Sequence, residues 1–244
     1  MSLYKCDLHI HSCLSPCGDE DNTPNNLLGM ASLSEIDILA LTDHNTAKNC
    51  PAFFEAAERY GVIPVAGMEL TTSEDIHVVC LFETLEDAMA FDREIAGRRV
   101  LIKNKASIFG EQLILDADDN VIGEEEYLLT NATTVSIEDA PELVHKYGGV
   151  CYPAHIDRTS NGIIAVLGTI PPTPHFDCVE LRDAERIGEY KEKYGIGDKT
   201  VIVSSDAHRL TDMKDGENFV TLDAPRDDAC AVRRALMDHL GRRI

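Results

Sequence analysis

The chain has 244 residues, of which 44% are hydrophobic and 27% charged, and its formal net charge is −21 at pH 7. This length suits a single α/β barrel, and the acidic excess argues against general binding to duplex nucleic acid, which requires a basic face. The N-terminus has no basic patch followed by an apolar stretch, so we expect no signal peptide and no membrane anchor. Without a secretion signal, the eight cysteines are expected to be reduced thiols of a cytoplasmic protein.

Apolar runs of strand length alternate with helical patterns along most of the chain. Expected strands lie at residues 37–43, 62–70, 76–82, 149–155, 176–181 and 200–206, and expected helices at 51–61, 84–95, 136–149, 184–195 and 227–240. The helix at 136–149 is predicted to begin with a Ser136–Asp139 capping box. Strands that alternate with helices favour a mostly parallel sheet, and about seven such units predict a closed or distorted barrel in one domain, residues 1–244.

The segment from Gly97 to Val135 breaks this alternation. Residues 112–129 have the pattern of a hairpin with its turn at Asp118–Asn120. We interpret residues 97–135 as an insertion into the barrel, which could cap the site as a lid or mediate assembly.

Side chains that can bind metals recur at the ends of the expected strands. His9 and His11 are two residues apart, so on a strand they point the same way and can bind one ion together. Asp206 and His208 repeat this spacing. The further candidates at strand ends are His44, Glu69, His77 and His155. The carboxyl ends of the strands in a parallel α/β barrel meet at one face, where active sites lie. His77 opens its strand instead, so we expect that strand to be antiparallel or kinked.

Imidazole and carboxylate ligands together suit zinc, manganese or iron. The candidates are too many for one ion, so we predict two or three divalent metal ions that share a bridging carboxylate. Ions this close can hold a bridging hydroxide nucleophile and bind the oxygens of a phosphoryl group. Such a centre would require no lysine or serine nucleophile.

The motifs HIH, TDHN, GMEL, PAH and SSDAH, in this order, resemble those of the PHP (polymerase and histidinol phosphatase) domain family, and the resemblance covers nearly the whole chain. It implies a distorted (β/α)7 TIM-like barrel, a trinuclear metal site and hydrolysis of a phosphate ester. It also implies a set of ligands. The first ion would take His9, His11, Glu69 and Asp206; Glu69 would bridge to the second, completed by His77 and His155. The third would take His44, His208 and a carboxylate from the loop after His11, either Asp19 or Asp21.

Neighbouring residues are given supporting roles. Arg158 is the candidate for the substrate phosphate, because a guanidinium binds phosphate through two parallel hydrogen bonds, and Arg209 is a second candidate. Asp7 shares a face with His9 and could orient it, whereas Asp43 is expected to have a structural or supporting role. Cys13 and Cys17 flank a turn near the histidines and are interpreted as packing thiols. Asp206, Glu69 and Arg158 are thus the predicted catalytic residues.

Several functions stay open at this point. The expected substrate is a small phosphate ester such as a nucleotide, a nucleoside bisphosphate or a short single-stranded oligonucleotide end, with histidinol phosphate as the next choice. A metal-dependent amidohydrolase is a second hypothesis, although such enzymes usually employ a carboxylated lysine and no lysine ends an expected strand here. A non-catalytic metal-binding module is a third, because a fold alone does not establish activity.

Overall fold

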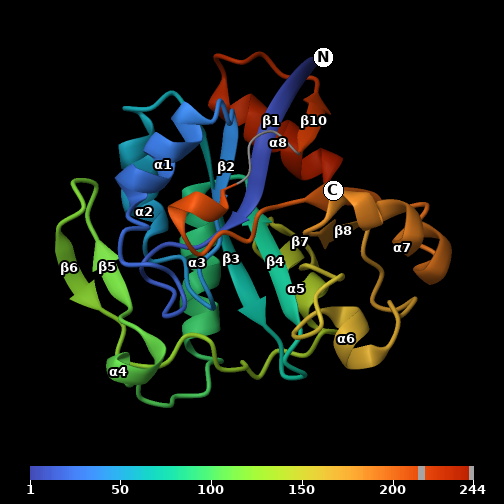
Figure 1. The fold of residues 1–244 in the computed structure, drawn as a ribbon, viewed down its shortest axis with the longest axis horizontal. Helices are drawn as coiled ribbons and strands as arrows, with labels where there is room; N and C mark the ends of the chain where they lie inside the picture. Colours follow the sequence, from blue (N-terminus) through green and yellow to red (C-terminus); the bar gives the residue numbers. More distant parts are fainter. Residues whose placement is uncertain (214–217, 242–244) are drawn as a thin grey trace.

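A curled six-stranded sheet organises the protein, whose computed structural model describes residues 1–213 and 218–241 (Figure 1). The sheet has the order β10-β1-β2-β3-β4-β7 and contains β1 (Ser2–Ile10), β2 (Ile38–Leu41), β3 (Ile63–Thr71), β4 (His77–Phe82), β7 (Val150–Pro153) and β10 (Phe219–Leu222). Two further pairs of strands are β8 (Cys178–Leu181) with β9 (Thr200–Val203), and the hairpin of β5 (Leu113–Leu115) and β6 (Val121–Glu124).

Seven of the described strands form a distorted barrel in the order β1-β2-β3-β4-β7-β8-β9. The segment that follows β7 is hydrogen-bonded to β8, because Ile156 N donates to Glu180 O at 2.8 Å. The segment after β9 returns to β1, where Ile10 and Ala207 form a parallel bridge. Strand β10 lies outside this ring and pairs antiparallel with the first residues of β1. The prediction of a distorted seven-stranded α/β barrel is therefore confirmed.

Strand β4 is antiparallel to both of its neighbours, β3 and β7. His77 lies opposite Thr71 in the register with β3, so the first residue of β4 lies at the carboxyl end of β3. This reversal explains how a histidine that opens its strand reaches the face where the other strands end, and it confirms the expected antiparallel direction.

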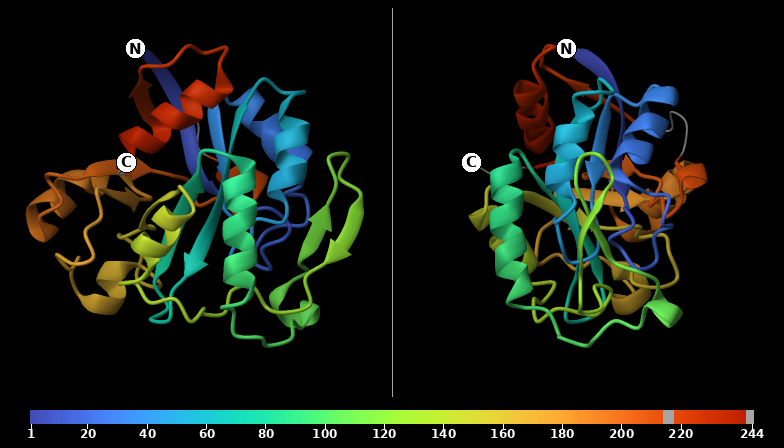
Figure 2. Two further views of the ribbon diagram at one scale, coloured as in Figure 1. Left: turned by 180° about the vertical axis from the view of Figure 1, so that it is seen from behind. Right: turned by 90° about the vertical axis from the view of Figure 1, so that its left-hand side faces the viewer.

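Helices cover the outer face of the sheet and one end of the barrel (Figure 2). The longer helices are α1 (Pro24–Leu33), α2 (Cys50–Ala57), α3 (Leu85–Ala96), α5 (Ala140–Lys146), α7 (Ile187–Tyr194) and α8 (Ala229–His239). The short ones are α4 (Ala106–Phe109), α6 (Ile163–Leu167) and the 3-10 turns η1 (Ala184–Arg186) and η2 (Leu210–Asp212). None of the helices within the described ranges is long and apolar enough to cross a membrane.

Alternate residues of the strands enter two separate cores, as the two-residue period of a strand requires. Leu39 and Met68 pack outward with Phe53 of α2. Ala40 and Val65 point into the barrel, into a core that also holds Val232, Leu236 and Met237 of α8. Helix α8 thus closes one end of the barrel. The other end, where the carboxyl ends of the strands lie, is left for a polar site.

The segment 97–135 contains the expected hairpin, which the side chain at the start of α2 holds against the rest of the protein. The turn is closed by a hydrogen bond from Asp116 N to Asn120 O at 3.0 Å, which agrees with the predicted turn. The side-chain amide of Asn49 makes two hydrogen bonds with the backbone of β5. It donates to Leu113 O at 3.1 Å and accepts from Leu115 N at 3.0 Å. The interpretation of this segment as an insertion stays a prediction.

Candidate metal centre

Six imidazoles and two carboxylates meet at the carboxyl ends of the barrel strands. They are His9, His11, His44, Glu69, His77, His155, Asp206 and His208. All are buried except His208, whose side chain is 25% exposed. The residues come from β1, β3 and β4 and from the segments that follow β1, β2, β7 and β9. The fold thus brings together side chains that are up to 199 residues apart in the sequence (His9 to His208).

Glu69 lies at the middle of this cluster and contacts five imidazoles. Its Oε1 lies 2.7 Å from His77 Nδ1, 3.0 Å from His155 Nε2 and 3.4 Å from His9 Nε2. Its Oε2 lies 3.0 Å from His44 Nδ1 and 3.2 Å from His11 Nε2. Burial alone would raise the pKa of Glu69, but the charges of His77, His9 and His44 hold it well below its ordinary value. An ionised carboxylate with neighbours on both oxygens has the arrangement that a bridging ligand needs.

Three overlapping groups of side chains could each hold one ion, with ligand atoms within 4.8 Å of one another. They are His9–His11–Glu69–Asp206, His44–Glu69–His77 and His11–His44–His208. His155 joins the second group through its 3.0 Å contact with Glu69. The first group contains the four residues of the expected first set. The second contains Glu69 and His77 of the expected second set, with His44 as an additional neighbour.

The hydrogen bonds of His9 and His11 leave one nitrogen of each neutral ring available to a cation. His9 Nδ1 lies 2.9 Å from Glu180 Oε1, so a neutral His9 carries its proton on Nδ1. The single proton of the Ser15 hydroxyl is donated to Asp43 at 2.7 Å, so His11 Nδ1, at 3.1 Å from that hydroxyl, must donate too. When both rings are neutral, their Nε2 atoms therefore present lone pairs that face each other at 3.2 Å. Such lone pairs repel unless a positive ion lies between them.

Glu180 is a positioning residue that the sequence patterns did not single out. It lies on β8, is fully buried, and its Oε1 also accepts from the backbone N–H of His155 at 3.0 Å. It thereby orients two candidate ligands on different strands. The sequence could have indicated this role, because Glu180 lies inside the apolar strand FDCVEL and a carboxylate is rarely buried without a partner.

Asp7 does not orient the ring of His9, contrary to our expectation. Its carboxylate accepts from Ser205 N at 3.1 Å and from Ser205 Oγ at 2.5 Å, and from His9 only through the backbone N–H at 3.4 Å. Through these bonds to Ser205, Asp7 holds the segment that carries Asp206. The ring of His9 is directed toward Glu180 on β8 instead.

Two of the candidate ligands have backbone conformations that L-amino acids rarely adopt. His155 has φ of 29° and Asp206 has φ of 51°. Non-glycine residues keep such conformations only where their surroundings impose them, and these positions concentrate at functional sites. The backbone at both positions thus supports a site that is held in place by its neighbours.

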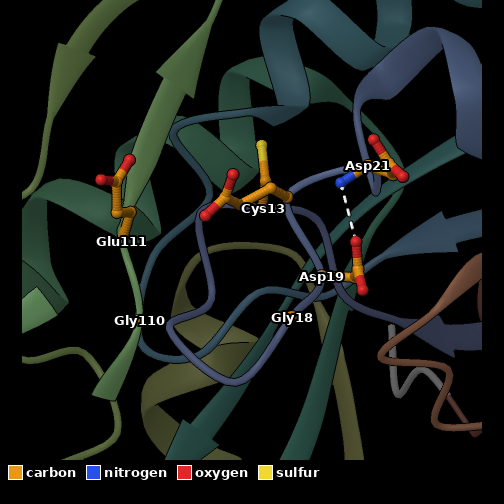
Figure 3. Close-up of a pocket in the computed structure, with 7 residues that line it drawn as sticks. Cys13, Gly18, Asp19, Asp21, Gly110 and Glu111 are labelled. Carbon is orange, nitrogen blue, oxygen red and sulfur yellow. Dashed lines mark hydrogen bonds between the residues drawn. The ribbon is translucent and has the colours of Figure 1, made fainter. Parts of the chain in front are cut away.

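Asp19 and Asp21, the candidates for the third ligand set, lie outside the three groups. Both are exposed and line a hollow of about 360 Å³ with Glu111 (Figure 3). The Asp19 carboxylate accepts a hydrogen bond from Asp21 N at 3.0 Å, which closes the turn locally. Because the turn points these side chains outward, the structure does not bring them to the imidazoles.

Cys17 is an exposed residue of the same loop and lies outside the three groups of possible ligands. Burial would raise the pKa of the thiol, but the charge of His44 and the nearby His208 lower it to about 5. The sequence signal was the position of this thiol in the turn SPCG next to the histidines, which we interpreted as packing alone.

The arginine predicted to contact substrate reaches the cluster. Arg158 Nη1 lies 2.9 Å from Asp206 Oδ2, and its side chain is 35% exposed. Arg182 lies beside it, with Nε 3.8 Å from the same oxygen and Nη2 3.3 Å from Ser205 O. Arg209 is exposed and lines a different hollow with Asp19 and Asp21.

An α/β barrel that gathers buried imidazoles and carboxylates at the carboxyl ends of its strands is the architecture of a metal-dependent hydrolase. The PHP domain model matches residues 7–169, and the chain belongs to this family. The expected resemblance is therefore confirmed.

Relatives extend this result at lower identity. An uncharacterized protein of Methanocaldococcus jannaschii is 35% identical over 78 residues, which cover 29% of this chain and 46% of that protein. The phosphoribosyl 1,2-cyclic phosphate 1,2-diphosphodiesterase of Eggerthella lenta is 26% identical over 186 residues, 74% of this chain and 68% of that enzyme. The chain thus spans less than half of the Methanocaldococcus jannaschii relative.

Solved structures share the fold. A lesion-specific endonuclease from Pyrococcus furiosus has a TM-score of 0.65 at 15% identity, with 98% of this chain aligned to 57% of that one. A protein from Bifidobacterium adolescentis, described as a metal-dependent phosphoesterase, has a TM-score of 0.60 at 18% identity, with 96% of both chains aligned. At these identities the likeness concerns the fold alone.

Proposed function

We propose that this chain is a metal-dependent phosphoesterase that acts on a small phosphate ester, such as a nucleotide, a nucleoside bisphosphate or a short oligonucleotide end. One observation carries the proposal: the buried cluster around Glu69 has a half-exposed arginine, Arg158, in contact with its ligand Asp206. A centre that binds cations next to a guanidinium suits a phosphate group. The Eggerthella lenta relative is itself named for hydrolysis of a phosphate diester.

The residues would hold two or three divalent ions, with manganese, iron and zinc all compatible with imidazole and carboxylate ligands. His9, His11, Glu69 and Asp206 would hold the first ion, and Glu69, His77 and His155 the second. Bound ions supply Lewis acidity and lower the pKa of water. Glu180 and Ser15 keep the rings of His9 and His11 in the tautomers that leave Nε2 free to bind.

Arg158 would bind the phosphate of the substrate. Its guanidinium reaches the cluster from the segment after His155 while part of it stays exposed to solvent. A guanidinium in this place can pair with two phosphate oxygens at once. Its present partner, Asp206, would keep it aligned until substrate arrives.

The charge of the chain favours a small or single-stranded substrate. A net charge of −21 repels the phosphates of a long duplex unless a basic surface compensates. A structural neighbour, Endonuclease Q, was solved with a 27-mer duplex that contains an abasic lesion. This chain covers only 58% of that neighbour, so the complex describes the neighbour alone. A duplex with an abasic lesion therefore belongs in the test as a competing outcome.

The test measures hydrolysis by protein reconstituted with manganese, as phosphate release from monoesters and as separation of the products by chromatography for the diesters, the nucleic acids and the amide. The panel contains nucleoside monophosphates, nucleoside 3′,5′-bisphosphates, short oligonucleotides, histidinol phosphate, a cyclic phosphate diester, the abasic duplex and an amide substrate. We expect strong turnover of one small phosphate ester and its loss in Asp206→Asn. Amide hydrolysis without phosphate release would reassign the chain as an amidohydrolase. Tightly bound metal with no turnover of any substrate would support a non-catalytic module.

A further inference from the structure

Asn45 directly follows the candidate ligand His44 and is buried. Its φ of 51° lies in the left-handed region, which asparagine adopts more readily than most residues. The backbone N–H of Asn45 donates to Glu69 O at 3.0 Å, and His44 forms a parallel bridge with Glu69. The backbone of Asn45 thus holds the segment after β2 against the end of β3, and each of these two elements carries a candidate ligand.

The side-chain amide of Asn45 connects the same place to the segment 97–135. Its Nδ2 donates to Leu129 O at 2.6 Å and to Asn131 O at 2.9 Å, which uses both amide protons. Its Oδ1 accepts from Thr71 N at 2.8 Å. One side chain therefore joins three parts of the chain, namely the segment after β2, the end of β3 and the segment 97–135.

The part of the segment 97–135 that Asn45 contacts is packed against the barrel. Leu129 is fully buried. Thr133 donates twice to Thr71 O, from its backbone N–H at 2.9 Å and from its hydroxyl at 2.8 Å. Opening this contact would leave buried carbonyl oxygens without donors, which is unfavourable. Residues 129–133 therefore form a fixed contact with the barrel.

We propose that Asn45 is a positioning residue of the metal centre, which fixes His44 and Glu69 relative to each other through its contact with the segment 97–135. The inference rests on the proposed function, because it assumes that the Glu69 cluster binds metal ions. His44 Nδ1 lies 3.0 Å from Glu69 Oε2, so a shift of the segment after β2 would separate two ligand atoms. Residues that orient ligands contribute to metal affinity without touching the ion. The segment 97–135 would accordingly stay docked during turnover instead of opening as a lid.

Asn45→Gly is the test variant, because glycine keeps the left-handed backbone and removes only the amide. Gln112→Ala is the matched control. The Gln112 amide is also buried; its Nε2 donates to two backbone carbonyls at 2.7 and 3.0 Å, and its Oε1 accepts from Leu129 N at 2.9 Å. These three bonds all lie within the segment 97–135. Calorimetric titration of the metal-free protein with manganese measures the affinity, and thermal unfolding without metal measures the stability.

We expect both variants to lower Tm, but only Asn45→Gly to weaken manganese binding, about 10-fold or more. Because Asn45 does not contact the substrate in this scheme, excess manganese should restore the turnover of the variant. Wild-type affinity in Asn45→Gly, or an equal loss of affinity in both variants, would overturn the inference.

Hydrogen–deuterium exchange of the wild-type protein tests the same connection without a substitution. Coupling between two sites is reciprocal, so manganese should slow exchange of the backbone amides at residues 128–134 more than in β6. Unchanged exchange at 128–134, or equal slowing in both stretches, would contradict the role of Asn45. Ester hydrolysis with wild-type manganese affinity in Asn45→Gly would refute the positioning role and leave the phosphoesterase standing. A selective loss of affinity without turnover of any ester would do the reverse.

Discussion

Replacing Glu180 by glutamine is expected to weaken metal binding while leaving the barrel folded. Glu180 Oε1 lies 2.9 Å from His9 Nδ1 and accepts the backbone N–H of His155 at 3.0 Å. Glutamine has nearly the same shape, and its amide oxygen can accept both hydrogen bonds. The change therefore removes the negative charge that makes His9 Nε2 a stronger ligand, and it places an amide NH2 where Glu180 Oε2 is buried without a hydrogen-bond partner.

The expected magnitude follows from the loss of one outer partner of a ligand. Such a loss typically lowers metal affinity about 10- to 100-fold, which corresponds to about 1.4 to 2.8 kcal/mol. Glu180→Ala removes the acceptor as well, and so leaves two buried donors unpaired. Each unpaired donor costs about 1 to 3 kcal/mol, so the alanine variant should lower the stability of the metal-free protein more than the glutamine variant does.

Calorimetric titration of the metal-free protein with zinc and with manganese measures the affinity, and thermal unfolding without metal measures the stability. Glu192→Gln, which changes an exposed acid on α7, is the matched control and should behave as wild type. Wild-type metal affinity in Glu180→Gln would refute the reasoning, because the charge of Glu180 would then make no contribution to the strength of His9 as a ligand.

Further predictions concern the cluster, the arginine, the metal and the thiol. Asp206→Asn should lower kcat for phosphate release about 100-fold or more, since a ligand and its charge are lost; unchanged kcat would contradict its role. Arg158→Ala should raise KM about 10-fold or more, because the substrate phosphate loses at least one charge-assisted hydrogen bond. Arg209→Ala should leave KM unchanged in the same assay. Removing metal with a chelator should lower Tm in a scanning-calorimetry experiment, because ions that bind only the folded state stabilise it. In metal-free protein, the rate of Cys17 alkylation should stay nearly constant from pH 6 to 8 and fall below its pKa of about 5, as followed by mass spectrometry; a rise of about tenfold per pH unit, typical of an ordinary thiol, would contradict the lowered pKa.

Strand ends could be predicted from the sequence because they depend on local patterns. Each apolar run identifies its own strand, and parallel strands bring their carboxyl ends together whatever the order in the sheet. For this reason His44 and His155 could be placed beside Glu69 without knowledge of the pairing, and the structure brings all three together.

The supporting contacts could not be predicted in the same way, because they join distant parts of the chain. Glu180 and His9 are 171 residues apart, and Asp7 and Ser205 are 198 apart. The interaction of Cys17 with His44 depends on the exact shape of a loop. Sequence spacing carries no information on such pairings, so Asp7 was assigned to the wrong partner.

Two elements show the limits of local patterns for the fold. Helix α1 was missed because Asn25, Asn26 and Gly29 are weak helix formers; it forms because Leu27 and Leu28 are fully buried in the core. The helix expected at 136–149 begins only at Ala140. The Ser136 hydroxyl accepts from Asp139 N at 3.1 Å and donates to Asp139 Oδ2 at 2.7 Å, but in the turn that precedes α5.

The reversal of β4 has a consequence for how the centre assembles during folding. Glu69 and His77 are separated by only eight residues, because a tight hairpin replaces the long helical crossover that parallel strands require. Contacts of short sequence separation form quickly, whereas those that close long loops form late. We expect this hairpin to bring its two ligands together early, and Asp206 to arrive only when the last strands join β1. Tight metal binding would then mark the moment at which the ring of strands closes.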